Sequence, residues 1–252
     1  MLLIAGGNSD AAVFKRLAAV LAADHRVVTY DPRGNSRGLL DGPPRDQRIE
    51  EHADDAYRLL DHLTGPDEPA HVFGRCSGGL VALELAVRDQ DRVRLTIAHE
   101  PPAMGLLPNA EDHLAFFDDV HETFRREGVA AALRKLRLVF EDGPAPTLPE
   151  AHDNTAFFPA HTVRPVTRFV PDLTTLATVA DRIVVAGGRD SRTHTVHRPA
   201  VALAEWLGRE RVLFPGGHVG YARYPVESAR RLVEVFAASS GAVTPDRTGA
   251  GR

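Results

Sequence analysis

The chain has 252 residues, a length that one α/β domain with an insertion can occupy. Its composition, 43% hydrophobic and 25% charged, is ordinary for a globular protein, and a formal net charge of -4 argues against nucleic acid or an anionic membrane as the main partner. The single cysteine excludes an internal disulfide, and the apolar start is short and lacks a basic lead-in. We therefore expect a cytoplasmic protein without a membrane-spanning segment.

Short apolar runs alternate along the chain with amphipathic helical stretches. Most of the runs are continuous, as expected of strands that are covered on both faces. The alternation predicts an α/β fold with a mostly parallel sheet and helices on both faces. Ligands bind beyond the carboxyl ends of such strands, so functional residues should follow strands directly. The predicted strands are 2–5, 26–30, 71–73, 93–98, 182–186 and 212–214.

The segment from residue 105 to 180 does not show this alternation of strands and helices. It contains helical patterns but no convincing strand, and it is too long for a simple connection. We predict that it forms a helical lid, inserted between the core segments 1–104 and 181–240. It includes a proline-rich joint, "DGPAPTLPE", at 142–150, and the tail 241–252 is predicted to be disordered.

The stretch "GRCSGG" is a candidate nucleophile elbow. It follows the strand at 71–73 and opens a helical pattern, and Gly74 and Gly78 stand two residues before and after Cys76. Small residues are needed there because the backbone of such a turn is strained and crowded. Ser77 would instead have Arg75 and Gly79 as its flanks, so the spacing favours the cysteine. The helix N-terminus that follows favours a thiolate.

Two further residues follow predicted strands. Asp190, in "VVAGGRD", comes after the strand at 182–186, and His218, in "PGGHVGY", comes after the last strand. A turn-forming aspartate or a solvated histidine would be unremarkable alone. The chain order nucleophile, acid, histidine is that of α/β-hydrolase triads.

Taken together, these segments resemble the α/β-hydrolase superfamily along nearly the whole chain. The first 36 residues, which contain "AGGNS" and "DPRGNS", look like its oxyanion strand, first helix and following loop. The usual His-Gly before the oxyanion turn is Ala5-Gly6 here, and cysteine replaces the usual serine nucleophile. Family members normally have two earlier strands, so we expect either more chain upstream of Met1 or an exposed sheet edge.

The resemblance implies a role for each of these residues. Cys76 would be the nucleophile, His218 the general base and acid, and Asp190 the group that orients the imidazole. The backbone N–H groups of Ser77 and of Gly7 or Asn8 would form the oxyanion hole. Some family members place the acid after the strand that ends near residue 98, which makes Glu100, in "AHEPPA", the alternative to Asp190.

The implied activity is hydrolysis of a small-molecule ester or lactone through a thioester acyl-enzyme. A thiolate expels poor alkoxides slowly, so activated substrates are expected: enol esters, lactones, aryl esters or thioesters. Acyl transfer or thioesterase action on the same triad, and a non-catalytic ligand-binding member of the fold, remain the alternatives. No cofactor is expected, and no metal either, because His194 and His197 make an incomplete ligand set.

Overall fold

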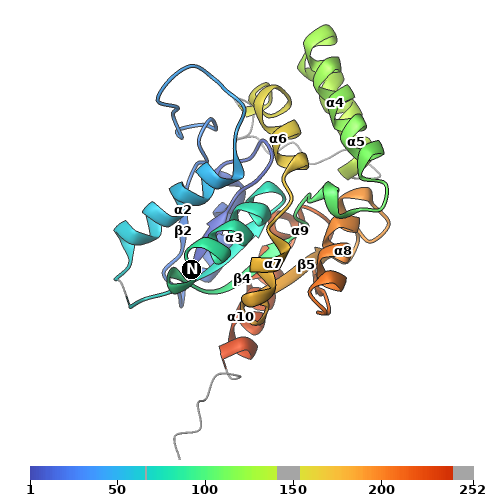
Figure 1. The fold of residues 1–252 in the computed structure, drawn as a ribbon. Coiled ribbons are helices and arrows are strands. Elements are labelled where there is room, and N and C mark those ends of the chain that lie inside the picture. The colour runs from blue at the N-terminus through green and yellow to red at the C-terminus, as the bar shows by residue number, and fades with distance from the viewer. Residues whose placement is uncertain (66, 141–153, 241–252) are drawn as a thin grey trace, which may run out of the picture.

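A six-stranded parallel sheet, in the order β2-β1-β3-β4-β5-β6, forms the centre of the protein (Figure 1). The structure is a computed structural model and describes residues 1–65, 67–140 and 154–240. All six predicted strands are present, and the predicted α/β fold is confirmed. The strands are β1 (Leu2–Ile4), β2 (Val28–Thr29), β3 (Ala70–Arg75), β4 (Val93–His99), β5 (Ile183–Gly188) and β6 (Val212–Phe214).

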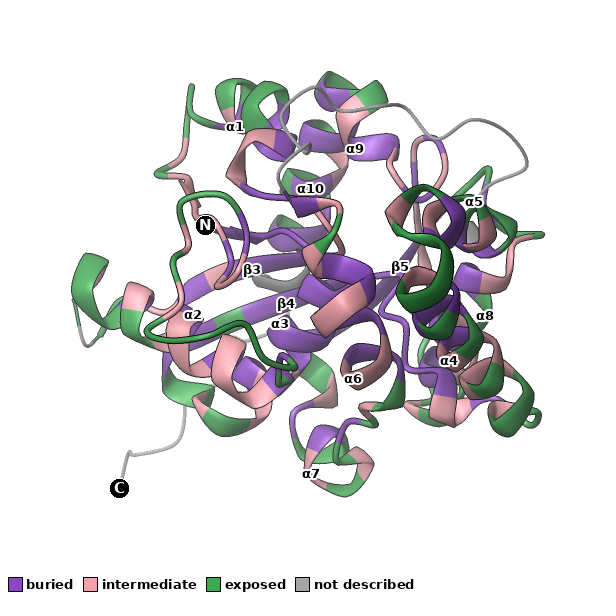
Figure 2. Ribbon diagram, turned by 90° about the horizontal axis from the view of Figure 1, so that it is seen from above, coloured by how far each residue is buried: buried purple, intermediate pink, exposed green. Residues whose placement is uncertain are grey.

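Helices cover both faces of this sheet (Figure 2). The α-helices are α1 (Lys15–Leu21), α2 (Ile49–Leu63), α3 (Ser77–Arg88), α4 (Ala110–Glu127), α5 (Val129–Phe140), α6 (Val163–Arg168), α7 (Leu173–Thr178), α8 (Arg198–Trp206), α9 (Gly220–Arg223) and α10 (Pro225–Ser240). Short helical turns of other types are Ala11–Phe14, Gln90–Arg92, Met104–Leu106, Phe158–Thr162, Ala180–Arg182 and Thr195–His197. Within the described residues, no helix is long and apolar enough to cross a membrane.

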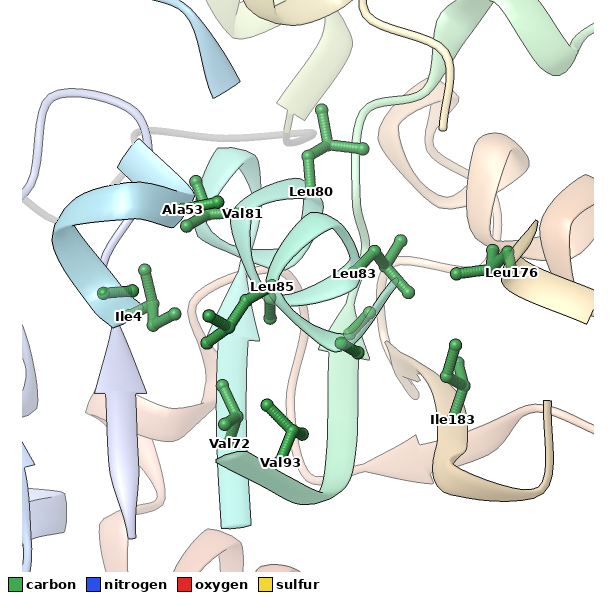
Figure 3. Close-up of a cluster of buried hydrophobic side chains, with 14 of the residues drawn as sticks. Ile4, Ala53, Val72, Leu80, Val81, Leu83, Leu85, Val93, Leu176 and Ile183 are labelled. Atoms are coloured by element: carbon green, nitrogen blue, oxygen red, sulfur yellow. The ribbon is translucent and has the colours of Figure 1, made fainter. Parts of the chain in front are cut away.

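Strand side chains alternate between two apolar clusters, one on each face. Val72 and its neighbours on one face pack against α2, α3, α7 and α8 (Figure 3). Phe73, one residue on, points to the opposite face and packs with α1, α9 and α10. Because successive side chains of a strand point to opposite faces, a continuous apolar run supplies both clusters. This two-sided burial fixes β3 at the centre of the sheet, where its carboxyl end carries the elbow.

The helical insertion after β4 has its own small core. Helix α4 has Glu111 and Asp112 in its first turn and Arg125 and Arg126 in its last, which suits the helix dipole, and Gly128 ends it with a φ of 84°. Phe117 and Val120 of α4 are buried with residues of α5 and α6 in this third cluster. The segment therefore buries its own apolar faces while it lies over the sheet end.

The last helix of the predicted lid belongs to the main core. Leu176 of α7 is fully buried in the cluster that packs on α3. Within the segment predicted as a lid, α7 therefore covers the sheet, whereas α4 and α5 form the separate layer and α6 contributes Val166 to the main core and Val163 to the separate one. The proline-rich joint at 142–150 and the tail 241–252 lie outside the described residues.

Candidate active site

Cys76 occupies a strained turn between β3 and α3. Its backbone has φ 51° and ψ -128°, a conformation that non-glycine residues rarely adopt. A Cβ on Gly74 would collide with the carbonyl group of Gly78, and a Cβ on Gly78 would collide with the carbonyl oxygen of Ile4. The two glycines are thus required for close approach, as the elbow pattern predicts. Strain of this kind is retained where the surrounding structure holds one side chain in place.

His218 reaches this cysteine from the loop between β6 and α9. Gly216 in this loop has a φ of 73°, and a Cβ on Gly188 would overlap the backbone of Gly217, so the loop lies tightly against the end of β5. The imidazole is 3% exposed and is hydrogen-bonded to the Cys76 sulfur. The histidine predicted from its position after the last strand is therefore brought to the predicted nucleophile.

The carboxylate beside His218 is that of Glu100, the alternative acid. Its Oε2 accepts a hydrogen bond of 2.7 Å from Nδ1 of His218. Its Oε1 accepts from Nδ1 of His197 at 2.9 Å, from the Gly188 N–H at 2.8 Å and from the Ser191 hydroxyl. Glu100 is fully buried, and its φ of 47° turns the side chain back toward the elbow. An ionised carboxylate only accepts hydrogen bonds, so both histidines carry their proton on Nδ1.

The first choice for this acid, Asp190, is corrected by this arrangement. Asp190 is exposed on the loop after β5, where its backbone N–H donates to the Gly216 carbonyl. β4 is the immediate neighbour of β3, whereas β5 lies one strand further away. The end of β5 and the loop after it contribute hydrogen-bond donors to Glu100, from Gly188 and Ser191, and His218 Nδ1 is bonded to Glu100 instead of Asp190.

These contacts set the protonation of all three groups. Burial alone raises the pKa of Cys76, but the hydrogen bond and charge of His218, together with the charge of Arg75, bring it below its usual value. Burial alone lowers the pKa of His218, yet the Cys76 sulfur and Glu100 raise it to about 9. Burial opposes ionisation of Glu100, but hydrogen bonds from His197 and His218 hold its pKa well below the usual range. All three shifts favour the charged forms: the thiolate, the imidazolium and the ionised carboxylate.

A model of the alpha/beta hydrolase family matches residues 1–235. The chain belongs to the α/β hydrolase family. It is 37% identical over 242 residues to the uncharacterized hydrolase YraK of Bacillus subtilis, a match that covers 94% of this chain and 88% of that protein.

Solved structures share the fold. A thermophilic esterase from Thermogutta terrifontis has a TM-score of 0.73 at 20% identity, over 94% of this chain and 89% of that one. The enol-lactonase from Burkholderia xenovorans LB400 has a TM-score of 0.67 at 18% identity, over 94% and 90%. At such identities the likeness concerns the fold alone.

The predicted oxyanion donors of this α/β hydrolase lie beside the elbow. The Ser77 N–H is directed at the Cys76 sulfur, and the Gly7 N–H donates to the Ser77 hydroxyl at 2.8 Å. A Cβ on Gly6 would lie 2.8 Å from the Ser77 nitrogen, so the end of β1 and the start of α3 are in close contact. Asn8, the other predicted donor, follows on the same turn and is half-buried. The Gly7 donor therefore becomes available to a ligand only when the Ser77 hydroxyl turns away.

A small cavity borders the Cys76 sulfur and has room for about one water molecule. Phe117 of α4 and Val163 and Val166 of α6 supply much of its wall, so the helical insertion contacts the space next to the nucleophile. Of the phenylalanines in the insertion, Phe158 also lines this cavity, whereas the Phe157 ring packs close to Gly34.

Sequence reasoning missed two residues of this α/β hydrolase site. Arg75, the last residue of β3, is 5% exposed and places its Nη2 3.1 Å from Nε2 of His218. His197, which the sequence suggested only as half of an incomplete metal set, holds Glu100 and accepts a hydrogen bond from Arg211 on its Nε2. A charged residue inside an otherwise apolar and glycine-rich elbow was the one available signal for Arg75. His197 had no such signal, because its partner Glu100 is 97 residues away.

Proposed function

We propose that this protein hydrolyses activated carboxylic esters or lactones with Cys76 as nucleophile, His218 as general base and acid, and Glu100 as the orienting carboxylate. The observation that best supports the proposal is a continuous buried line of contacts from the Cys76 sulfur through the His218 imidazole to Glu100. This line starts at a residue whose strained backbone has no evident purpose other than display of its side chain.

The reaction begins with attack of the Cys76 thiolate on the substrate carbonyl carbon. The developing oxyanion accepts hydrogen bonds from the Ser77 N–H and from Gly7 or Asn8, donors that typically contribute about 3 kcal/mol each. His218, protonated on Nε2, gives this proton to the leaving alkoxide, and the C–O bond breaks. Glu100 keeps the other nitrogen protonated throughout and so fixes the ring.

The second half of the reaction releases the carboxylic acid product. His218, now neutral, accepts a proton from water through Nε2, and the resulting hydroxide attacks the thioester carbonyl. The C–S bond breaks, the acid leaves, and the thiolate and imidazolium return. No cofactor takes part in this scheme.

The substrate class follows from the sulfur and from the cavity. A thiolate is itself a good leaving group, so it forms a stable acyl-enzyme only when the departing alkoxide is stabilised, as in enol, aryl or thiol esters. The cavity beside Cys76 is lined mainly by apolar side chains, which favours an apolar acyl group over a charged one. The fold neighbours described as an esterase and an enol-lactonase are consistent with this class.

The test is hydrolysis of p-nitrophenyl acetate by the wild-type protein and by Cys76→Ala. We expect turnover that iodoacetamide abolishes, an acetylated protein in the mass spectrum, and loss of about a thousandfold or more in kcat/KM for Cys76→Ala. Ser77→Ala is the matched control, because it removes the neighbouring hydroxyl and leaves the sulfur.

Activity that survives Cys76→Ala would refute the assignment of the nucleophile. An added alcohol or thiol separates the hydrolase from the alternatives: formation of a new ester would indicate acyl transfer. Binding of ester without acetylation of Cys76 would indicate a non-catalytic member of the fold.

A further inference from the structure

Arg75 is a buried cation next to the reacting groups. Its Nη1 donates to the Ser9 hydroxyl at 3.1 Å and to the Gly6 carbonyl oxygen at 3.4 Å, and its guanidinium lies 5.4 Å from the centre of the Tyr221 ring. Among residues 1–65, 67–140 and 154–240, no carboxylate lies within ion-pair distance of it. Burial of a charge without an opposite charge is costly, so a partner within the site is needed.

The Cys76 sulfur, when ionised, would be such a partner, because Arg75 Nη2 lies 3.1 Å from His218 Nε2 and His218 is hydrogen-bonded to this sulfur. Arg75 and Cys76 are adjacent in the chain, and the positive charge of Arg75 acts on the thiol in the direction of ionisation. His218 provides one positive charge beside the sulfur, and Arg75 provides a second one that does not depend on a titrating proton.

The contact between Arg75 and His218 has a separate consequence. A guanidinium only donates hydrogen bonds, so its 3.1 Å contact with Nε2 is a hydrogen bond when that nitrogen carries no proton and a repulsive contact between two cations when it does. The Cys76 thiolate favours a proton on Nε2 of His218, whereas Arg75 favours an Nε2 that carries no proton. While the sulfur is a thiolate, its negative charge opposes this effect of Arg75, but formation of the thioester removes that charge. Of the Cys76 sulfur and Arg75, only Arg75 then carries a charge.

We propose that Arg75 is a positioning residue with two duties: it is the second cation beside the Cys76 sulfur, and it holds His218 as a neutral base once the acyl group is attached. The inference rests on the proposed function. The neutral base is what the second half of that reaction requires, since Nε2 must accept the proton of the attacking water, which replaces the Arg75 donor at this nitrogen. When the C–S bond breaks, the departing thiolate again faces Arg75.

The first duty is tested without any ester. The rate of Cys76 alkylation by iodoacetamide is measured against pH for the wild-type protein, Arg75→Gln and Arg75→Lys. Loss of the cation should move the inflection of the Gln variant to higher pH, with alkylation slowed about tenfold on the acidic limb for each pH unit of movement. The Lys variant keeps the charge and should stay near the wild-type profile. An unchanged profile in a folded Gln variant would overturn this part of the proposal.

The second duty is tested on the acyl-enzyme. Deacylation after a single turnover with p-nitrophenyl acetate should slow in Arg75→Gln, and the rise of its rate with pH should move to higher pH, because His218 there binds a proton more readily. Equal deacylation profiles for the two proteins would contradict the proposal. Failure of the proposed function would look different: no acylation in either protein, with the alkylation profiles still separated.

Wild-type protein offers a measurement that needs no folded variant. Alkylation by iodoacetamide converts the thiolate to a neutral thioether and so imitates the charge of the acyl-enzyme. Nitrogen NMR of His218 just below the ordinary histidine pKa of about 6.5 should then show a neutral ring with its proton on Nδ1. A doubly protonated ring would overturn the second duty.

Discussion

The ends of β4 and β5 present two acidic residues in similar sequence settings but in opposite environments. Glu100 and Asp190 each follow a buried apolar strand, and each precedes a turn. Glu100 is fully buried and accepts four hydrogen bonds, whereas Asp190 is exposed. The comparison teaches that an acid suited to orient a histidine is defined by the donors around it. Those donors come in part from the strand that was expected to carry the acid itself.

The largest difference in activity is expected between the variants Glu100→Gln and Asp190→Asn. The glutamine can present an N–H to His218 and drive its proton onto Nε2, the wrong nitrogen for a base, so kcat/KM should fall about a thousandfold. Asp190→Asn should stay within about threefold of the wild-type value, as surface changes usually do. Kinetics with p-nitrophenyl acetate decide the ranking, and the reverse order would return the acid to the loop after β5.

A smaller effect is expected where His197 holds Glu100. His197→Ala removes the donor at 2.9 Å from Oε1 and leaves the carboxylate free to shift, which should lower kcat about tenfold, in line with the loss of one hydrogen bond to a charged group. His197→Asn can place an amide N–H near the position of Nδ1 and should recover most of this loss. Equal activity of the Ala and Asn variants would mean that the hydrogen bond does not matter for turnover.

The smallest effect is expected in the dependence of kcat/KM on pH for Asp190→Asn. In the wild-type protein the pKa of His218 is raised to about 9, so acylation by phenyl acetate, whose leaving group needs a proton, should decline as pH rises through that value. Loss of a carboxylate next to the imidazole would lower this pKa and move the limb to lower pH. Because Glu100 is the neighbouring carboxylate, Asp190→Asn should leave the limb of kcat/KM in place. A downward shift would show that Asp190 acts on His218 after all.

Much of this site was accessible from local sequence. The elbow at Cys76 depends on residues within two positions of it, and the requirement for Gly74 and Gly78 is a matter of close backbone contact that any chain at this turn must meet. His218 was found by its position after the last strand. Both predictions used short-range rules: continuous apolar runs for strands, and small residues for a crowded turn.

The choice between the two acids was beyond such rules. Glu100 is set by a left-handed backbone at the end of β4 and by donors from Gly188, Ser191, His197 and His218, which lie 88 to 118 residues further along the chain. The extent of the helical insertion is a similar case, because Leu176 of α7 is buried in the main core, where α7 contacts α3.

The sequence by itself determined the α/β architecture, the strained elbow and the candidates for nucleophile and histidine, because these depend on patterns within a few residues. Only the tertiary structure decided which carboxylate is hydrogen-bonded to His218, that His197 contacts the same carboxylate, and that Arg75 lies against Nε2. Hydrogen bonds of a buried charge are made between strand ends that are distant in the chain, and the order and register of the strands decide which of them meet.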